Sequence, residues 1–174
     1  MSRIAYDLQK IKGVAFDVDG VLSPSTIPTS AFGEPLRMVN IKDGYALQLA
    51  VKLGLKIAII TGGTSRGVQV RYNGLGISDV YMGVAHKTGT FSEWMAANGL
   101  GPEEVAYVGD DVPDIKCMEM AGLAVAPADG CPDVKEIATY ISPVNGGYGV
   151  ARDLLEQILR AKGMWMSDSK AFGW

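Results

Sequence analysis

Short apolar runs alternate along the chain with segments that have a helical period. The runs are as long as buried strands, and six strands are expected, at residues 14–18, 56–60, 80–82, 105–108, 123–125 and 140–142. Helices are expected between or after them, at residues 43–53, 64–73, 88–98, 112–121 and 149–161. This alternation is typical of a parallel sheet with helices on both faces. The pattern therefore predicts an α/β fold, a Rossmann-like three-layer sandwich, in a single domain spanning residues 1–174.

The helix expected at residues 43–53 illustrates the pattern. Asp43 is the expected N-cap, and Gly54 ends the helix. The apolar positions fall on one face, which we expect to be buried: Ala46, Leu47, Leu49, Ala50 and Leu53.

Two segments depart from this alternation. Residues 23–40 are rich in Pro and predict a short hairpin or loop excursion after the first strand, too short to form a separate cap domain. Residues 163–174 form a tail with three large aromatic side chains, Trp165, Phe172 and Trp174. Such a tail would be costly to leave in water. It packs either on the core of its own chain or on a neighbouring subunit.

Composition and charge exclude several classes of function. The net charge of −3 contains no long run of one sign, so nothing favours binding to nucleic acid or to an anionic membrane. The N-terminus has no apolar signal segment, and no apolar run is long enough to cross a membrane, so we expect a cytoplasmic protein. The single histidine, His86, excludes a zinc site built from several histidines.

Two acidic clusters follow two of the expected strands. Asp17 and Asp19 lie at the end of the first strand, where alternation of side chains would place both on one face. Asp110, Asp111 and Asp114 follow the strand at 105–108. In open α/β sheets the carboxyl ends of the strands border the ligand crevice, so we expect the two clusters to meet. Converging carboxylates repel each other unless a cation lies between them, and oxygen donors without soft ligands favour Mg²⁺.

Two further strand ends suit a phosphate group. Thr61-Gly62 follows the strand at 56–60, where a hydroxyl and backbone N–H groups lead into a helix. Lys87 follows the third strand and its turn, and its ammonium could neutralise a phosphate or an aspartate. Each signal is weak alone, but together they predict a phosphate site beside the acidic clusters.

Four motifs in order, Asp17-Val18-Asp19-Gly20-Val21, Thr61-Gly62, Lys87 and Gly109-Asp110-Asp111-Val112-Pro113-Asp114, resemble the haloacid dehalogenase superfamily of phosphotransferases. Residues 39–45, 107–111 and 146–149, together with the lack of a cap domain, are similar to the 3-deoxy-D-manno-octulosonate 8-phosphate (KDO 8-phosphate) phosphatases. The resemblance extends from about residue 10 to the end of the chain. It implies a Mg²⁺-dependent phosphatase of lipopolysaccharide precursor synthesis that releases the free sugar acid and phosphate.

The resemblance also implies roles for individual residues. Asp17 would attack phosphorus and form an aspartyl-phosphate, and Asp19 would protonate the leaving sugar oxygen and then activate water. Thr61 and Lys87 would contact the transferring phosphoryl group. The implied magnesium site consists of Asp17, the backbone carbonyl of Asp19, and Asp110, supported by Asp111 and Asp114. Asp114 alternatively only caps a helix.

Substrate contacts follow from the same resemblance. Besides Asp19 and Lys87 the candidates are Asn40, Lys42, Asp43, Gly44, Gln48, Gly62 and Arg71. Arg71 is alternatively a surface arginine. The resembled family is tetrameric, so we expect a homotetramer in which other subunits or the substrate itself close the open site. At Gly63 some relatives carry a longer polar or charged side chain, so the choice between an eight-carbon and a nine-carbon sugar acid stays open, with the shorter favoured.

Three alternatives remain beside this hypothesis. The chain is a phosphatase of a nine-carbon sugar acid 9-phosphate, a phosphatase of another phosphomonoester, or a non-catalytic assembly module that keeps the fold. The stretch Gly146-Gly147-Tyr148-Gly149 either turns the chain into its last helix or has a further role.

Overall fold

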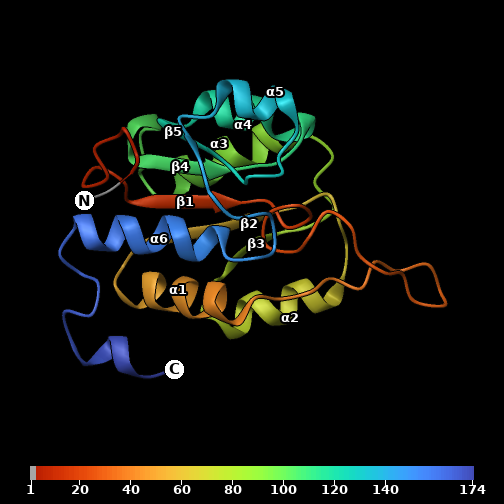
Figure 1. Ribbon diagram of the computed structural model, residues 1–174, viewed down its shortest axis with the longest axis horizontal. Helices are drawn as coiled ribbons and strands as arrows, with labels where there is room; N and C mark the ends of the chain where they lie inside the picture. Colours follow the sequence, from red (N-terminus) through yellow and green to blue (C-terminus); the bar gives the residue numbers. More distant parts are fainter. Residues whose placement is uncertain (1–2) are drawn as a thin grey trace.

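The computed structural model describes residues 3–174 and has three layers (Figure 1). The middle layer is one sheet of six strands in the order β3-β2-β1-β4-β5-β6, and every neighbouring pair is parallel. Its strands are β1 (Gly13–Phe16), β2 (Lys56–Ile60), β3 (Asp79–Tyr81), β4 (Val105–Val108), β5 (Leu123–Ala126) and β6 (Tyr140–Ile141). The predicted Rossmann-like α/β sandwich is confirmed.

Helices cover both faces of the sheet (Figure 1). On one face lie α1 (Ile41–Lys52), α2 (Arg66–Gly74) and α6 (Val150–Ala161); on the other lie α3 (Lys87–Ala97), α4 (Ile115–Met120) and α5 (Pro132–Ile137). Strand β1 shows why its sequence is apolar throughout. Val14 and Phe16 pack into the core on the α1 and α6 face, and Ala15 packs into the core on the opposite face. A strand that is buried on both faces reads as a continuous apolar run.

Several predicted boundaries were wrong. Strand β1 ends at Phe16 and not at residue 18, because the carbonyl of Val18 accepts hydrogen bonds from the N–H groups of Val21, Leu22 and Ser23 and so closes a turn. Helix α1 begins at Ile41, two residues before the expected range, and its N-cap is Asn40, three residues before the predicted Asp43.

Helical structure also differs in detail from the pattern. The helix expected at 112–121 is divided into a 3-10 turn at Val112–Asp114 and α4. Helix α5 was not predicted. Two further 3-10 turns lie at Pro102–Glu104 and Ser169–Phe172. Among residues 3–174 no helix combines the length and the apolar content needed to cross a membrane.

The segment after β1 extends away from the sheet (Figure 1). Within residues 23–40 the chain folds back on itself, with an antiparallel bridge between Thr29 and Pro35 and a hydrogen bond of 2.9 Å from the Leu36 N–H to the Pro28 carbonyl. The tip is exposed, and Phe32 is 94% accessible. The expected hairpin is therefore present, and no cap domain accompanies it in the described part of the chain.

The C-terminal tail returns to its own chain beside α1 (Figure 1). The ring of Trp165 meets that of Tyr45 edge to face at 6.1 Å and lies 4.7 Å below the guanidinium of Arg152. Phe172 and Trp174 stay exposed. Near the end of the tail, Ala171 is buried and its carbonyl accepts a hydrogen bond from the Tyr45 hydroxyl, and the ring of Trp174 meets that of Tyr45 edge to face at 6.1 Å. The tail thus packs on its own core, while Phe172 and most of the Trp174 side chain remain exposed.

Candidate active site

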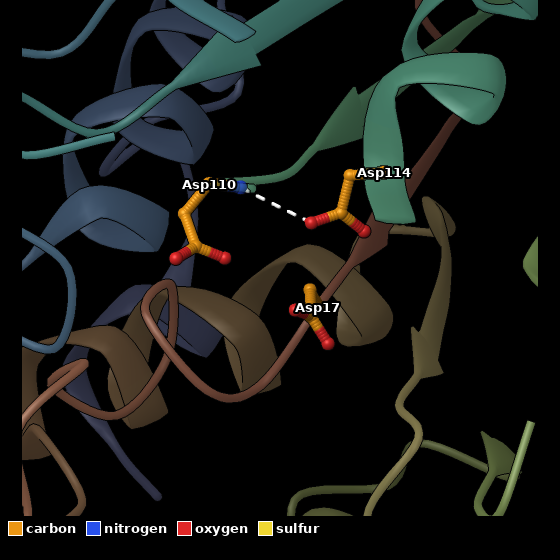
Figure 2. Close-up of side chains that lie close together, drawn as sticks. All are labelled: Asp17, Asp110 and Asp114. Atoms are coloured by element: carbon orange, nitrogen blue, oxygen red, sulfur yellow. Dashed lines mark hydrogen bonds between the residues drawn. The ribbon is translucent and has the colours of Figure 1, made fainter. Parts of the chain in front are cut away.

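Three carboxylates meet at the carboxyl ends of β1 and β4 (Figure 2). Strands β1 and β4 are paired with Phe16 opposite Val108, and the N–H of Asp17 continues this ladder with a 3.0 Å hydrogen bond to the Val108 carbonyl. Asp110 follows β4, and Asp114 lies in the 3-10 turn one step further. One oxygen from each of Asp17, Asp110 and Asp114 lies within 4.8 Å of the others. The two acidic clusters converge, as predicted from the strand ends.

A glycine makes room for the second cluster. Gly20 has a φ of +85°, and a β-carbon at this position would lie 1.9 Å from Oδ2 of Asp110. The loop after β1 can therefore approach the Asp110 carboxylate only with glycine at this position. The backbone of Asp110 is fixed as well, because its N–H donates a hydrogen bond to Oδ2 of Asp114 at 3.2 Å (Figure 2).

Lys87 is the cation of the cluster. It is the first residue of α3, and its buried ammonium lies 2.9 Å from Oδ1 of Asp17 and 2.8 Å from Oδ1 of Asp114. The hydroxyl of Tyr107 donates to the same Asp114 oxygen at 2.9 Å. Asp114 thus uses both oxygens within the protein, one for Lys87 and Tyr107 and the other for the Asp110 N–H. Its carboxylate orients Lys87 and the second acidic turn.

One ammonium among three carboxylates leaves the cluster negatively charged. Burial, and then repulsion from Asp114, raise the pKa of Asp17 to about 7, although Lys87 opposes the shift. Burial, and then repulsion from Asp17 and Asp114, raise the pKa of Asp110 to about 7 as well. Burial alone would lower the pKa of Lys87, but the carboxylates of Asp17 and Asp114 outweigh it and raise that pKa. The cluster is therefore short of positive charge.

A hard divalent cation fits this donor set. The site offers carboxylate oxygens at the separation that one ion could bridge, in a partly buried place where their mutual repulsion is uncompensated. Asp17 and Asp110 are the better ligand candidates, because Asp114 already uses both of its oxygens. The described residues form no cluster of histidine or cysteine ligands that would favour a softer metal.

A cavity of about 500 Å³ opens above these groups. Strand β2 ends beside it, where the N–H of Thr61 donates to the Tyr81 carbonyl at 2.9 Å and the N–H of Gly63 donates to Oγ1 of Thr61 at 3.1 Å. All predicted catalytic and metal residues line this cavity: Asp17, Asp19, Thr61, Lys87, Asp110, Asp111 and Asp114. Gly62 lines it as well, and so do Ser25, Gly63, Val84, Ala85 and Pro113, which were not predicted.

Known proteins are similar to this chain in sequence and in fold. A family model described as haloacid dehalogenase-like hydrolase matches residues 68–154, which include Lys87 and the second acidic cluster. The 3-deoxy-D-manno-octulosonate 8-phosphate phosphatase KdsC of Escherichia coli K12 is 39% identical over 155 residues, which cover 89% of this chain and 82% of the relative. The chain belongs to the KDO 8-phosphate phosphatase family of haloacid dehalogenase-like hydrolases.

Solved structures of the family superpose closely. The 3-deoxy-D-manno-octulosonate 8-phosphate phosphatase from Yersinia pestis has a TM-score of 0.87 at 35% identity, covering 91% of this chain and 85% of that chain. The enzyme from Moraxella catarrhalis, determined in complex with magnesium, phosphate and KDO, has a TM-score of 0.86 at 33% identity and covers 91% of each chain. These likenesses extend over the whole fold.

Six of the predicted substrate contacts do not line the catalytic cavity: Asn40, Lys42, Asp43, Gly44, Gln48 and Arg71. Lys42 lines a separate cavity formed with the C-terminal tail, and Arg71 lines a third, of about 270 Å³, under residues 34–39. The side chain of Asn40 caps α1 by accepting from the N–H groups of Lys42 and Asp43. Their role as substrate contacts in this family member stays a prediction.

Asp43 has a structural partner instead. Its Oδ1 accepts a 2.6 Å hydrogen bond from the backbone N–H of Arg152, in the first turn of α6. Gly149, the N-cap of α6, has no side chain to do this. Burial, opposed by the hydrogen bond and charge of Arg152, raises the pKa of Asp43 to about 6. Asp43 therefore caps a helix other than its own.

Arg37 was missed by the sequence analysis. Its Nε donates to Oδ1 of Asp19 at 2.8 Å and its Nη2 donates to Oδ2 at 2.7 Å, so the pair is bidentate. The hairpin segment thus reaches into the site of this family member. No sequence signal marked Arg37, because its segment has no periodicity and its partner lies 18 residues away.

Proposed function

We propose that this chain is a magnesium-dependent phosphatase that hydrolyses KDO 8-phosphate to the free sugar acid and phosphate, in lipopolysaccharide precursor synthesis. The observation that carries the proposal is the convergence of Asp17, Asp110 and Lys87 at one cavity, in a chain 39% identical to a curated phosphatase of this substrate. The Moraxella catarrhalis relative holds magnesium, phosphate and KDO together, which supports the same cofactor and substrate class here.

The first half of the reaction transfers the phosphoryl group to the enzyme. A carboxylate oxygen of Asp17 forms a bond to phosphorus while the ester bond to the sugar oxygen breaks. Asp19 gives a proton to that leaving oxygen, and the sugar acid departs. In the second half Asp19 takes a proton from water, the water oxygen bonds to phosphorus, and the bond to Asp17 breaks to release phosphate.

Fixed charges lower the barrier to this attack of one anion on another. Lys87, held between Asp17 and Asp114, offsets negative charge on the nucleophile and on the phosphoryl oxygens. The hydroxyl of Thr61 and the N–H of Gly62 would donate to those oxygens. Bound to Asp17, Asp110 and the Asp19 carbonyl, with Asp111 and Asp114 in support, magnesium would supply positive charge to the phosphoryl group.

Assembly and location complete the proposal. We treat residues 1–174 as one hydrolase domain without a cap, place it in the cytoplasm, and expect a homotetramer. The exposed Phe172 and Trp174 at the end of the tail support contact with another subunit, because large aromatic side chains are costly to leave in water.

The deciding experiment measures phosphate release from a panel of esters, with magnesium and with EDTA. The panel contains KDO 8-phosphate, a nine-carbon sugar acid 9-phosphate, neutral sugar phosphates and a phosphopeptide. We expect the highest kcat/KM for KDO 8-phosphate and none without the metal. Preference for another ester would select the corresponding alternative, and no release from any ester would favour a non-catalytic assembly module.

A further inference from the structure

Arg37 links two cavities. The larger one is the catalytic cavity, which Asp19 and Gly63 line; the smaller, of about 270 Å³, is lined by Arg37 together with Ser65 and Arg71. The guanidinium of Arg37 stands at their boundary, since it binds Asp19 through two nitrogens. Its side chain is only 11% exposed although it comes from a surface loop.

The position of this guanidinium depends on Gly63. A β-carbon at residue 63 would lie 2.4 Å from Nη2 of Arg37 and 3.1 Å from Cζ. A contact of 2.4 Å does not occur, so any side chain at this position would push the guanidinium away. The absence of a side chain at Gly63 therefore allows Arg37 to enter the site.

The pair between Arg37 and Asp19 cannot persist during turnover. Both oxygens of Asp19 accept hydrogen bonds from Arg37, an arrangement that requires an ionised carboxylate. The acid that protonates the leaving sugar oxygen must carry a proton on one of these oxygens, so the bidentate pair has to open before Asp19 can act. Lys87 cannot replace Arg37 as the cationic partner of Asp19, because it is already paired with Asp17 and Asp114. A largely buried guanidinium that loses its carboxylate needs another anion, since an unpaired buried charge is costly.

We propose that Arg37 is a substrate-binding residue, which leaves Asp19 when substrate binds and pairs with an oxyanion of the substrate, either its carboxylate or its phosphoryl group. The planar, bidentate fork of arginine suits either oxyanion. This inference rests on the proposed function and adds a cationic contact from the hairpin segment. The substrate oxyanion would leave the guanidinium paired with an anion after it has left Asp19.

The first test compares Arg37→Ala, Arg37→Gln and Arg37→Lys with wild type, at saturating magnesium. We expect KM for KDO 8-phosphate to rise roughly tenfold to a hundredfold in the Ala and Gln variants, the range for loss of a charge-assisted pair, and partial recovery in the Lys variant. Arg66→Ala is the matched control, because Arg66 is exposed at the start of α2. Thermal unfolding of each variant confirms that it folds.

The second test is a double-mutant cycle with Gly63→Ala. The added methyl group should displace the guanidinium and raise KM in the wild-type background, and have little effect when Arg37 is already Ala. Equal effects of Gly63→Ala in both backgrounds would show that the two positions are independent and would overturn the argument from the contact.

The substrate panel identifies the oxyanion. A KM penalty in Arg37→Ala that is confined to sugar acid phosphates assigns the carboxylate, and an equal penalty with neutral sugar phosphates assigns the phosphoryl group. An unchanged or lower KM with every ester overturns the proposal, because Arg37 would then only restrain Asp19. If wild type prefers an ester other than KDO 8-phosphate, the proposed substrate fails, and the same comparison with the preferred ester still decides the role of Arg37.

Discussion

Asp43→Asn should make the protein more stable at high pH and leave it nearly unchanged at low pH. The Asp43 carboxylate is 2% exposed, and Oδ1 accepts from the Arg152 N–H. Oδ2 is buried without a hydrogen-bond partner. The substitution keeps the acceptor for α6 and removes the charge.

The magnitude follows from the pKa. Burial, despite the Arg152 N–H and charge, raises the pKa of Asp43 from 3.8 to about 6, and at 1.36 kcal/mol per pH unit this corresponds to roughly 3 kcal/mol. Because the folded pKa lies above the unfolded one, ionisation favours the unfolded chain, so stability is lost as the pH rises through both values. The cost is about a fifth developed at pH 4, about half developed at pH 5 and complete above pH 7.

Urea unfolding of wild type and Asp43→Asn at pH 4, 5, 6 and 8 measures the effect. The difference in unfolding free energy between the two proteins should move in favour of the variant by up to ~2.5 kcal/mol between pH 4 and pH 8. Asp17 and Asp110 also titrate, but they do so in both proteins and cancel in the difference. Asp43→Ala is the control for the cap, and it should be about 0.5–2 kcal/mol less stable than Asp43→Asn at every pH, because both variants lack the charge and only Ala lacks the acceptor.

A difference that does not change with pH would refute this reasoning, since Asp43 would then ionise as easily in the folded as in the unfolded protein. The KM of Asp43→Asn for KDO 8-phosphate gives a second result from the same variant. An unchanged KM would confine Asp43 to capping α6, and a large increase would support its predicted role as a substrate contact.

Three further predictions concern the site and the tail. Asp17→Asn should keep the fold but lower kcat at least about 10³-fold, because the nucleophile is lost; near-normal turnover would contradict an aspartyl-phosphate mechanism. Because the pKa values of Asp17 and Asp110 are raised to about 7, the metal-free protein should lose stability as the pH rises from 4 through 7. Magnesium should therefore raise the melting temperature more at pH 8 than at pH 5, and much less in Asp110→Asn. Deletion of residues 164–174 should raise KM or disturb assembly, and unchanged kinetics with an unchanged oligomer would limit the tail to packing on α1.

The sheet and the acidic cluster were accessible from sequence for the same physical reason. Strands buried on both faces need continuous apolar runs, so β1, β2, β4 and β5 stand out. Parallel strands also bring their carboxyl ends to one edge, which placed Asp17 beside Asp110 without any knowledge of distances.

The errors arose where local sequence allows several structures. Both Asn40 and Asp43 are good N-cap residues, and only the position of α6 decides between them, because Asp43 is drawn to the Arg152 N–H. Helix α5 has six residues and gives too short a pattern to be recognised. Arg37 lies in a segment without periodicity, and its contact with Asp19 depends on the empty space at Gly63.

The start of α1 supports the loop that carries Asp19, through the glycine stretch 146–149. The side chain of Asn40 lies 3.4 Å from the Gly147 carbonyl, and the N–H of Gly147 donates to the Val21 carbonyl at 2.7 Å. A β-carbon on Gly146 would lie 1.8 Å from the Gly20 carbonyl oxygen, so the glycine stretch 146–149 does more than turn the chain. The glycine stretch packs directly on the turn at residues 18–23, which follows β1 and contains Asp19.

Residues at this junction can therefore be necessary for catalysis without contact with substrate. Asn40 fixes the start of α1 and the glycine stretch, and Asp43 fixes the start of α6 where that stretch ends. Movement of either would shift Gly20, against which the Asp110 carboxylate rests. A displacement of about 1 Å at such a support is enough to lower a rate a hundredfold. Loss of activity on substitution of Asn40 or Asp43 thus identifies a substrate contact only if KM rises while magnesium affinity stays unchanged and the melting temperature does not fall.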